Sequence, residues 1–524
     1  MKRFLSLYAL LLCMVCGLVA QTDVQRFAET ITADDLATYL NVLAADNMEG
    51  RETGTPANTR AAEYIAGKFA DFGIPPLPGQ QDYYQQVSFS RVRLEASSMQ
   101  VNEGTFRHMK DFVVIPGQMP VEEIRIEDSE VIFLGYGIDD VQYSDYGKKD
   151  LTGKTILIYA GEPVDSNGIS LLTGSEELTE WSEDISLKTA AAFARGVNAV
   201  LIIEDDFREL VSQQRRFILG GRTIMGDPQL ATGNQAPHVH LSSTLAEQIL
   251  GKKAKKVIRA RDRIVYKGKS RSVKVPVDIT ASIRRVVDIT PGANVCAYIE
   301  GTDPVLRNEV VVITAHYDHV GRRGDEIFNG ADDNASGTSG VMEIAQAFME
   351  AKRAGAGPRR SVLCMLVTGE EKGLLGSQYY SEFPLFPLEQ TVANINMDMI
   401  GRSDAQHTDS NYVYVIGSDR LSTELHEINE AMNRQYTQLE LDYTYNAKDD
   451  PNRFYYRSDH YNFAKHGIPA IFYFSGVHED YHRPSDTVDK IMFKRAETIA
   501  RLAFYTGWEL ANRDKRIEVN VKSD

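Results

Sequence analysis

Cysteine is scarce in this sequence of 524 residues, which contains four, and Cys13 and Cys16 lie in an apolar stretch near the N-terminus. The other two, Cys296 and Cys364, are too few for a disulfide framework, so the hydrophobic core must supply the stability. The sequence leaves open whether these two pair. Long apolar runs are missing beyond residue 20, and no internal repeat or low-complexity tract is present. These absences argue against a membrane-spanning segment in the mature protein and against a fibrous or disordered chain.

Basic charge is also in deficit, with 57 Lys and Arg against 73 Asp and Glu and a net charge of −16. Because phosphate groups are bound mainly through Lys and Arg, nucleic acid is not an expected partner. A local exception is the segment 252–274, which has eleven basic residues and one acid, Asp262. A nucleic-acid patch is one interpretation of this segment. Since its charges alternate with apolar residues such as Val257 and Ile264, we instead expect charged edge strands that resist aggregation.

The N-terminus has the pattern of a targeting segment. Lys2 and Arg3 precede an apolar run of 17 residues, Phe4–Ala20, and the polar Gln21 follows. A basic start, a short apolar run and a small residue at its end predict a secretory signal peptide at residues 1–20. The run falls just short of the roughly 20 residues that span a bilayer, and an uncleaved anchor is the alternative. We therefore expect a secreted or periplasmic protein with no stable membrane insertion after cleavage.

We expect two folded domains after the signal peptide. Their boundaries are residues 24–99 and 276–515 for a split main domain, 100–275 for an inserted domain and 516–524 for a polar tail. In the main domain apolar strands alternate with amphipathic helices, which is typical of βαβ units. This predicts an α/β fold in which a mostly parallel mixed sheet has helices on both faces. Short apolar strands and loops rich in Gly, Asp and Ser predict a β-rich insertion.

Individual elements follow from the same patterns. The main domain is expected to have strands at residues 309–315, 361–368, 392–397, 412–416 and 469–474. Its expected helices run from a capping box at Thr32 and Asp35 to about residue 45, and over 57–72, 336–352, 422–435, 458–466 and 493–513. The insertion is expected to have strands at 130–136, 154–159 and 199–203, and a helix at 187–194.

Histidines and acids follow several of these strands directly. Eight of the eleven histidines fall between His316 and His482. The chemically suitable side chains after the strands are His316, Asp318, His319, Asp332, Asp333, Glu370, Glu371, Asp398, His478 and His482. Because ligands of an open parallel sheet bind beyond the carboxyl ends of its strands, we expect these side chains to meet at one edge.

The chemistry of such a set points to metal. Two histidines and three carboxylates suit Zn²⁺ and, less specifically, Mn²⁺ or Co²⁺. Five ligands are more than one catalytic zinc with an open position needs, and they suit two metals that share a bridging carboxylate and clamp the reacting oxygens of a hydrolysis. Of the adjacent Glu370 and Glu371, one carboxylate can ligate while the other takes the proton of the attacking water.

Five segments together resemble the co-catalytic dizinc exopeptidases, which include bacterial leucyl-type aminopeptidases and glutamate-carboxypeptidase-like proteins. The segments are residues 316–318 (HYD), 330–337 (GADDNASG), 368–371 (TGEE), 396–401 (NMDMIG) and 481–487 (YHRPSDT). In the insertion, residues 143–146, 153–154 and 192–197 resemble a protease-associated domain.

The resemblance implies a ligand set for two Zn²⁺ ions per chain. His316 and Asp398 would hold one zinc, and Glu371 and His482 the other. Asp333 would bridge them. The bridging aspartate of the family lies three residues before a Ser-Gly pair, and Asp333, not Asp332, has this position before Ser336 and Gly337.

The resemblance also implies catalytic roles. Glu370 would be the general base that activates a water bridging the metals, Asp318 would orient His316, and Tyr481 would polarise the scissile carbonyl. His319 and His460 are expected to support the site from outside the ligand set. The implied function is that of an exported aminopeptidase acting on peptides with a free N-terminus.

Several alternatives stay open on these residues. A glutamate-type carboxypeptidase would need cationic groups for a terminal carboxylate, and a receptor-like peptide-binding protein would have lost ligands. A glutaminyl cyclase would work with one zinc, which does not suit the full ligand set. The pattern HEDYH at 478–482 matches the one-zinc HExxH motif, but Gly476 and Pro484 favour a loop over the required helix. The aromatic run 454–456 either lines a side-chain pocket or packs in the core, and the oligomeric state and the partner of the insertion stay open.

Overall fold

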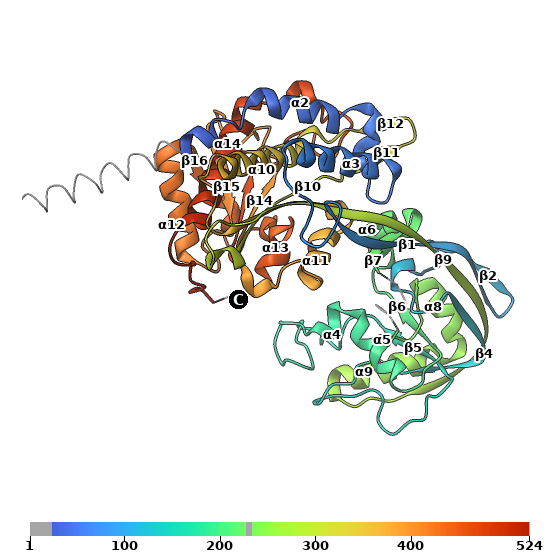
Figure 1. The fold of residues 1–524 in the computed structure, drawn as a ribbon. Coiled ribbons are helices and arrows are strands. Elements are labelled where there is room, and N and C mark those ends of the chain that lie inside the picture. Colours follow the sequence, from blue (N-terminus) through green and yellow to red (C-terminus); the bar gives the residue numbers. More distant parts are fainter. Residues whose placement is uncertain (1–23, 227–232, 523–524) are drawn as a thin grey trace, which may run out of the picture. The chain divides into compact units, whose positions relative to one another are not determined.

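The computed structural model describes residues 24–226 and 233–522, which separate into two compact units (Figure 1). One unit comprises the chain up to Ser88 and from Thr290 onward, and the other spans Phe89–Ile289. The expected signal peptide at residues 1–20 lies outside the described residues. The second unit is wider than the expected insertion 100–275.

A mixed, mostly parallel sheet forms the centre of the first unit. Its strands in spatial order are β16 (Glu440–Asp442), β15 (Tyr412–Ile416), β17 (Ala470–Phe474), β14 (Thr391–Asp398), β10 (Val310–His316), β13 (Ser361–Val367) and the last residues of β9 (Val273–Ile299). Pairing is parallel except at β15–β17 and β13–β9. Every residue of β10, β13, β14, β15 and β17 is buried, as expected for parallel strands covered on both faces. The predicted fold class and the five predicted strands are confirmed.

Helices cover the two faces of this sheet (Figure 1). Alternate residues of β10 point into two different cores, one on each face of the sheet. Val311 and Ile313 belong to the same core as Phe348 and Phe504, and Val310 and Val312 lie in the second core. The helices of the first face are α2 (Ala33–Leu43), α3 (Pro56–Asp71), α10 (Gly337–Arg353), α12 (Thr423–Met432) and α14 (Phe493–Asn512). Those of the second face are α11 (Leu375–Glu382) and α13 (His460–Ala464). All expected helices of this unit are present.

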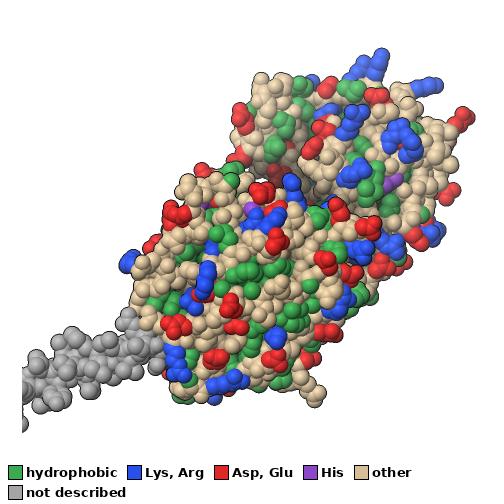
Figure 2. Space-filling model, turned by 90° about the horizontal axis from the view of Figure 1, so that it is seen from above, with side chains coloured by type: hydrophobic (Ala, Val, Ile, Leu, Met, Phe, Trp, Pro, Cys, Tyr) green, Lys and Arg blue, Asp and Glu red, His purple; other side chains and the backbone are tan. Residues whose placement is uncertain are grey.

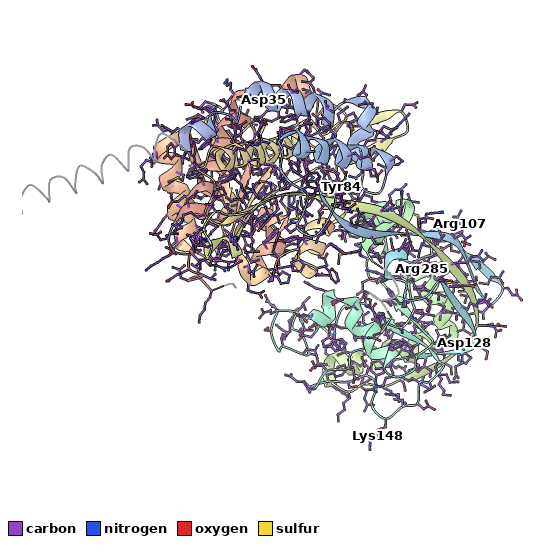
Figure 3. All side chains as sticks on the ribbon, in the orientation of Figure 1. Asp35, Tyr84, Arg107, Asp128, Lys148 and Arg285 are labelled. Atoms are coloured by element: carbon purple, nitrogen blue, oxygen red, sulfur yellow. The ribbon has the colours of Figure 1, made fainter. Side chains whose placement is uncertain are left out.

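The start of α2 shows how sequence sets a helix boundary. The Thr32 hydroxyl accepts a hydrogen bond from the Asp35 amide at 3.1 Å, which satisfies one free N–H of the first turn. The same hydroxyl donates to the Asp35 carboxylate at 2.7 Å, and Asp35 is labelled on α2 in Figure 3. The Thr32 amide instead donates to Glu343 of α10 at 3.1 Å. The predicted cap is therefore present. In a full capping box the side chain of Asp35 would accept from the Thr32 amide, and here Glu343 of the neighbouring helix takes that place.

The second unit also has a sheet with helices. Its parallel strands are β4 (Glu123–Phe133), β5 (Thr155–Tyr159), β6 (Ala199–Ile203) and β8 (His238–Leu241), with the short β3 (Phe112–Val113) antiparallel to β8. The predicted strands and the helix α5 (Ile185–Phe193) are present. Two long strands, β1 (Tyr84–Val101) and β9, were not predicted as such. They run through the unit boundary, which explains why the unit is wider than expected. Figure 3 marks Tyr84 on β1 and Arg285 on β9.

The prediction of charged edge strands in the segment 252–274 is wrong. Most of the segment forms the helix α9 (Ala254–Lys267), and only its end joins β9. Val257, Ala260 and Ile264 are buried at spacings of three and four residues, which is one face of a helix. The apolar residues therefore follow a helical period, and the basic residues between them line the opposite face. Helices α6 (Phe207–Gly220) and α8 (Ser243–Leu250) also give this unit more helix than expected.

Both remaining cysteines are buried free thiols on neighbouring strands. Cys296 of β9 lies opposite Met365, and Cys364 of β13 lies opposite Ala297, so the register offsets them. No helix in the described part of the chain is both long and apolar enough to cross a membrane. On the face shown in Figure 2, acidic and basic side chains are interspersed, with hydrophobic side chains between them.

Candidate metal centre

The carboxyl ends of four neighbouring strands carry the candidate site. His316 is the last residue of β10 and Asp398 the last of β14. Glu370 and Glu371 open a short 3-10 turn after β13. The other members of the set are Asp333, in the turn that precedes α10, and His482, in the loop after β17. The structure thus brings together all five predicted ligands at one sheet edge, as the strand order predicts.

The first of two donor groups surrounds His316. Its Nε2 lies 3.4 Å from Asp333 Oδ1, 3.4 Å from Asp398 Oδ1 and 3.9 Å from Glu370 Oε2. Asp398 is held from behind, since the Ser458 hydroxyl donates to its Oδ2 at 2.7 Å. His316 itself is 1% exposed, so its ring is buried.

The second donor group surrounds Glu371. His482 Nε2 lies 3.0 Å from Asp333 Oδ2 and 3.1 Å from Glu371 Oε1. His319 Nδ1 lies 2.9 Å from the same Glu371 oxygen and 3.6 Å from Asp333 Oδ2. The four donor atoms all lie within 4.8 Å of one another. His319, which we expected outside the ligand set, is therefore part of this group. The signal for it was its place three residues after His316, directly behind the same strand.

These groups fit two metal ions. Asp333 directs one oxygen at each group, as a bridging carboxylate would. Donor atoms of a tetrahedral zinc site lie about 3.3 Å apart when the bonds are about 2.0–2.1 Å, and most of the separations above are close to that value. The buried His316 Nε2 and Glu371 Oε1 also have no hydrogen-bond partner in the described structure. Buried polar atoms rarely stay unpartnered, so this cluster has the chemistry of a ligand set.

The two adjacent glutamates are electrostatically different. Burial raises the pKa of Glu370 well above its usual value, and the nearby carboxylates of Glu371 and Asp398 add to this. Burial also opposes ionisation of Glu371, but His319 and His482 outweigh it and lower the pKa of this carboxyl to about 2. Neighbouring carboxyls with pKa values pushed in opposite directions are typical of a pair with separate roles, one proton carrier and one permanent anion.

Asp333 and His482 are also charged because of their neighbours. Burial opposes ionisation of Asp333, but His319, His316 and His482 together hold its pKa well below the usual range. Burial likewise opposes protonation of His482, and Asp333 and Glu371 outweigh it and raise its pKa to about 10. Positive charge is therefore strongly favoured at this position, whether it is carried by protons or by a metal ion.

Asp318 supports the site differently from the prediction. His316 Nδ1 lies 3.1 Å from the main-chain oxygen of Asp318, and the nearest carboxylate oxygen is 3.8 Å away. The carboxylate instead accepts hydrogen bonds from Thr53 Oγ1 at 2.7 Å and from the amides of Glu370 at 3.2 Å and Glu371 at 3.4 Å. Asp318 thus orients His316 through its main chain and the glutamate turn through its side chain.

Tyr481 lines a cavity together with both donor groups. Its ring stacks on His482 with centroids 4.0 Å apart, and burial, then Asp333 and Glu371, raise the pKa of its hydroxyl so that it stays protonated. The remaining wall of the cavity consists of Met399, Phe454, Arg457, Phe472, Phe474 and Val477. A hydrogen-bond donor and a wall that is apolar except for Arg457 therefore face the candidate metal centre.

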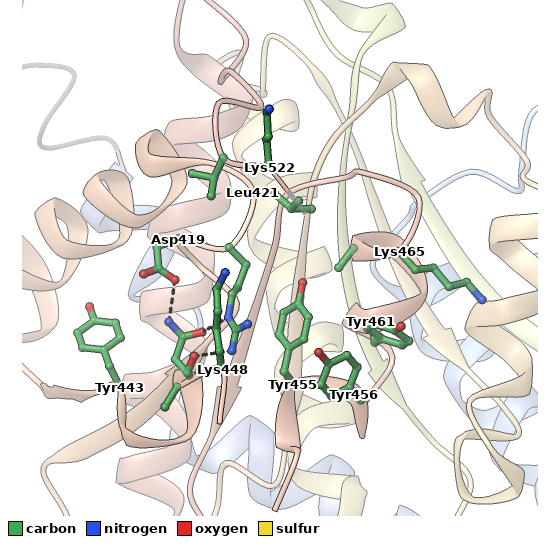
Figure 4. Close-up of a pocket in the computed structure, with 14 residues that line it drawn as sticks. Asp419, Leu421, Tyr443, Lys448, Tyr455, Tyr456, Tyr461, Lys465 and Lys522 are labelled. Atoms are coloured by element: carbon green, nitrogen blue, oxygen red, sulfur yellow. Dashed lines mark hydrogen bonds between the residues drawn. The ribbon is translucent and has the colours of Figure 1, made fainter. Parts of the chain in front are cut away.

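A larger cavity of 660 Å³ lies on the same unit and shares no lining residue with the metal centre (Figure 4). Tyr455, Tyr456 and Tyr461 line it, and the Arg420 guanidinium lies 4.7 Å from the centroid of the Tyr455 ring. The aromatic run 454–456 is therefore divided, with Phe454 at the metal centre and the two tyrosines at this second cavity.

The one-zinc HExxH interpretation does not fit the geometry. Residues 478–482 form a turn, and His482 has a φ of 54°. His478 Nε2 lies 3.3 Å from Asp332 Oδ2 and does not belong to either donor group. Asp332 also accepts from the Gly401 amide at 2.6 Å, so this aspartate supports the loops and Asp333 faces the two groups.

Comparison with known proteins agrees with this geometry. Residues 294–507 match the model of peptidase family M28. A probable leucine aminopeptidase of Arthroderma otae is 29% identical over 215 residues, which are 40% of this chain and 56% of that protein. Aminopeptidase YwaD of Bacillus subtilis is 27% identical over 216 residues, which are 40% of this chain and 42% of that protein. The chain thus spans about half the length of the curated relatives it matches.

The fold is shared with a solved structure as well. The aminopeptidase from Aneurinibacillus sp. strain AM-1 superposes with a TM-score of 0.53 at 18% identity, covering 95% of this chain and 99% of that one. Both donor groups lie inside the matched segment 294–507. The candidate site therefore lies within the segment that matches peptidase family M28, and the predicted resemblance to the co-catalytic zinc exopeptidases is confirmed.

Proposed function

We propose that this protein is an exported, zinc-dependent aminopeptidase that removes N-terminal residues from peptides. The observation that carries the proposal is the pair of donor groups that share Asp333, with the carboxyl of Glu370 3.9 Å from His316 in one of them. The family match and the aminopeptidase relatives support peptide hydrolysis. The basic and then apolar N-terminal stretch, residues 1–20, supports export.

The residues divide the work of holding two Zn²⁺ ions. His316 and Asp398 would hold one ion, Glu371 and His482 the other, and Asp333 would contact both. When bound, the ions supply Lewis acidity that polarises a carbonyl and lowers the pKa of water. The remaining roles fall to side chains that this chain positions itself.

Glu370 is placed to move the proton. Its carboxyl is next to the His316 group, and burial and the neighbouring carboxylates raise its pKa, which makes it a stronger proton acceptor than an ordinary carboxylate. It takes the proton of the attacking water and delivers it to the leaving amine. The protonated Tyr481 hydroxyl donates a hydrogen bond to the carbonyl oxygen as negative charge develops there.

The sign of the site favours an amine over a carboxylate. Asp333, Glu370 and Asp398 line one cavity, and such a concentration of carboxylates attracts an N-terminal ammonium group. Arg457 on the same cavity wall is the observation that favours the alternative, a glutamate-type carboxypeptidase. Receptor-like peptide binding without catalysis is the second alternative, and a complete ligand set argues against it.

Three versions of one peptide test the proposal: a free peptide, its N-acetylated form and its C-amidated form, each with added Zn²⁺ and with chelator. We expect cleavage of the free and C-amidated peptides, no cleavage of the acetylated one, and loss of activity with chelator. Equal cleavage of the acetylated peptide contradicts an aminopeptidase, and loss of activity on C-amidation favours the carboxypeptidase. Fewer than one tightly bound zinc per chain favours the receptor-like alternative.

A further inference from the structure

His319 is a buried histidine whose ring has no ordinary structural partner. The side chain is 0% exposed, and neither ring nitrogen makes a regular hydrogen bond with the described residues. A buried histidine normally directs at least one nitrogen to a hydrogen-bond partner. His319 instead points its Nδ1 at Glu371 Oε1, 2.9 Å away, and at Asp333 Oδ2, 3.6 Å away.

The surrounding backbone is shaped to hold this ring. Gly330 has a φ of 58°, and a Cβ at this position would lie 2.5 Å from two carbons of the His319 ring. Any residue with a Cβ at position 330 would clash with the ring, so only glycine leaves the ring of His319 in its present place. The His319 amide also donates to the main-chain oxygen of Arg51 at 3.4 Å. The ring is thus fixed against the Glu371 group.

The two donor groups are consequently unequal. The His316 group has one histidine, and Glu370 in it is reserved for proton transfer, which leaves His316, Asp398 and Asp333 as donors. The Glu371 group has two histidines and two carboxylates, with separations of 2.9, 3.0, 3.1 and 3.6 Å among its donor atoms. Zinc sites with four protein donors are closed, and those with three keep a position for water or substrate.

We propose that His319 is a zinc ligand through its Nδ1, so that the metal held by Glu371, His482 and Asp333 has four protein donors. The inference rests on the proposed function, since it assumes that the two groups hold zinc. With three protein donors, the metal held by His316 would then keep a position for water or substrate. The fourth donor also makes the Glu371 site the tighter of the two.

The competing explanation is a charged imidazolium that forms an ion pair with Glu371 and needs no metal. The two explanations differ in the ring itself. As a ligand, His319 is neutral in the zinc-loaded protein, with its proton on Nε2. As an ion-pair partner, it carries protons on both nitrogens. Nitrogen-15 NMR of the histidine-labelled protein distinguishes these states, with the His319 signals identified by their loss in His319→Asn.

The NMR experiment determines the state of the ring in the zinc-loaded wild-type protein, and His319→Asn serves only to assign its signals. We expect a neutral His319 ring whose Nδ1 signal shifts when zinc is removed. A doubly protonated ring with zinc bound overturns the inference. If the wild-type protein holds no zinc at all, the proposed function fails first, and the two failures are thereby distinguished.

Zinc affinity supplies a second readout, measured by competition with a chromophoric chelator. We expect His319→Ala to bind one of its two zinc ions at least about 10-fold more weakly, the lower limit of effects already seen for residues that only support ligands. The matched control is His460→Ala, because His460 is equally buried, has no hydrogen bond from its ring and stacks on Phe472 at 4.8 Å outside both groups. Two zinc affinities within twofold of the wild type in His319→Ala overturn the inference.

Discussion

Glu370 and Glu371 are neighbours in the chain, yet their carboxyl groups face different histidines. Glu370 Oε2 lies 3.9 Å from His316 Nε2, and Glu371 Oε1 lies 3.1 Å from His482 Nε2. Both amides are held by the carboxylate of Asp318, which fixes the turn that separates them. One short turn therefore supplies a proton carrier to one donor group and a ligand to the other.

Replacing Glu370 by Gln is expected to lower kcat by a factor of about 10²–10⁴, because the amide cannot accept the proton of water. Zinc content should stay at the wild-type value, since Glu370 is not in the proposed ligand set. Steady-state kinetics and metal analysis on the same preparation check this. The matched control is Glu371→Gln, which should lose zinc as well as activity. Wild-type turnover in Glu370→Gln would remove the base from the mechanism.

Ser458 is expected to act through Asp398. Its hydroxyl donates to Asp398 Oδ2 at 2.7 Å and accepts from Asn396 Nδ2 at 2.8 Å, so it fixes the orientation of the carboxylate. Ser458→Ala should weaken zinc binding at the His316 group by about 10–100-fold, which equilibrium competition with a chelator measures. Ser339→Ala is the control, because Ser339 is equally buried and its hydroxyl has no hydrogen-bond partner in the described structure. Equal zinc affinities in the two variants would contradict the role of Ser458.

Tyr481→Phe separates carbonyl polarisation from metal binding. The change removes one hydroxyl and keeps the ring that stacks on His482. We expect kcat/KM to fall by about 10²-fold or more, as for the loss of a donor to a developing oxyanion, with two zinc ions retained. If activity is unchanged, the carbonyl oxygen is stabilised without this hydroxyl.

Glu343 is expected to make stability depend on pH. Burial, with Asp35 nearby, raises the pKa of this carboxyl to about 8, and its Oε2 accepts from the Thr32 amide. Between its ordinary pKa of 4.5 and about 8, the folded protein holds a proton that the unfolded chain has released. The free energy of unfolding therefore falls as pH rises through this window.

Glu343→Gln removes this titration and keeps an acceptor oxygen for Thr32. Relative to the wild type, the variant should gain at least about 1 kcal/mol more in the free energy of unfolding at pH 9 than at pH 5, since one pKa unit is worth about 1.4 kcal/mol. Denaturant unfolding with zinc present at both pH values measures the difference. An equal effect of Glu343→Gln at both pH values would contradict a raised pKa.

Much of the main unit could be predicted from local patterns. The apolar runs of β10 and β13 and the cap at Thr32 depend on residues close together in the chain, so they can be predicted without tertiary contacts. The gathering of the ligands was also predictable, because side chains that follow parallel strands must meet at one edge. The helix α9 was misread, since short stretches of alternating charge and apolar residues fit a strand as well as a helix.

The amino-acid sequence by itself determined the α/β fold of the main unit and the edge that carries the site, and the family resemblance implied Asp333 rather than Asp332 as the bridging residue. Only the tertiary structure decided where each donor atom points. In the folded protein the main-chain oxygen of Asp318 faces His316, and its carboxylate accepts a hydrogen bond from the amide of Glu370. The ring of His319 lies against Glu371. Side-chain direction depends on contacts between segments far apart in the chain, such as Gly330 against His319, and no local pattern encodes them.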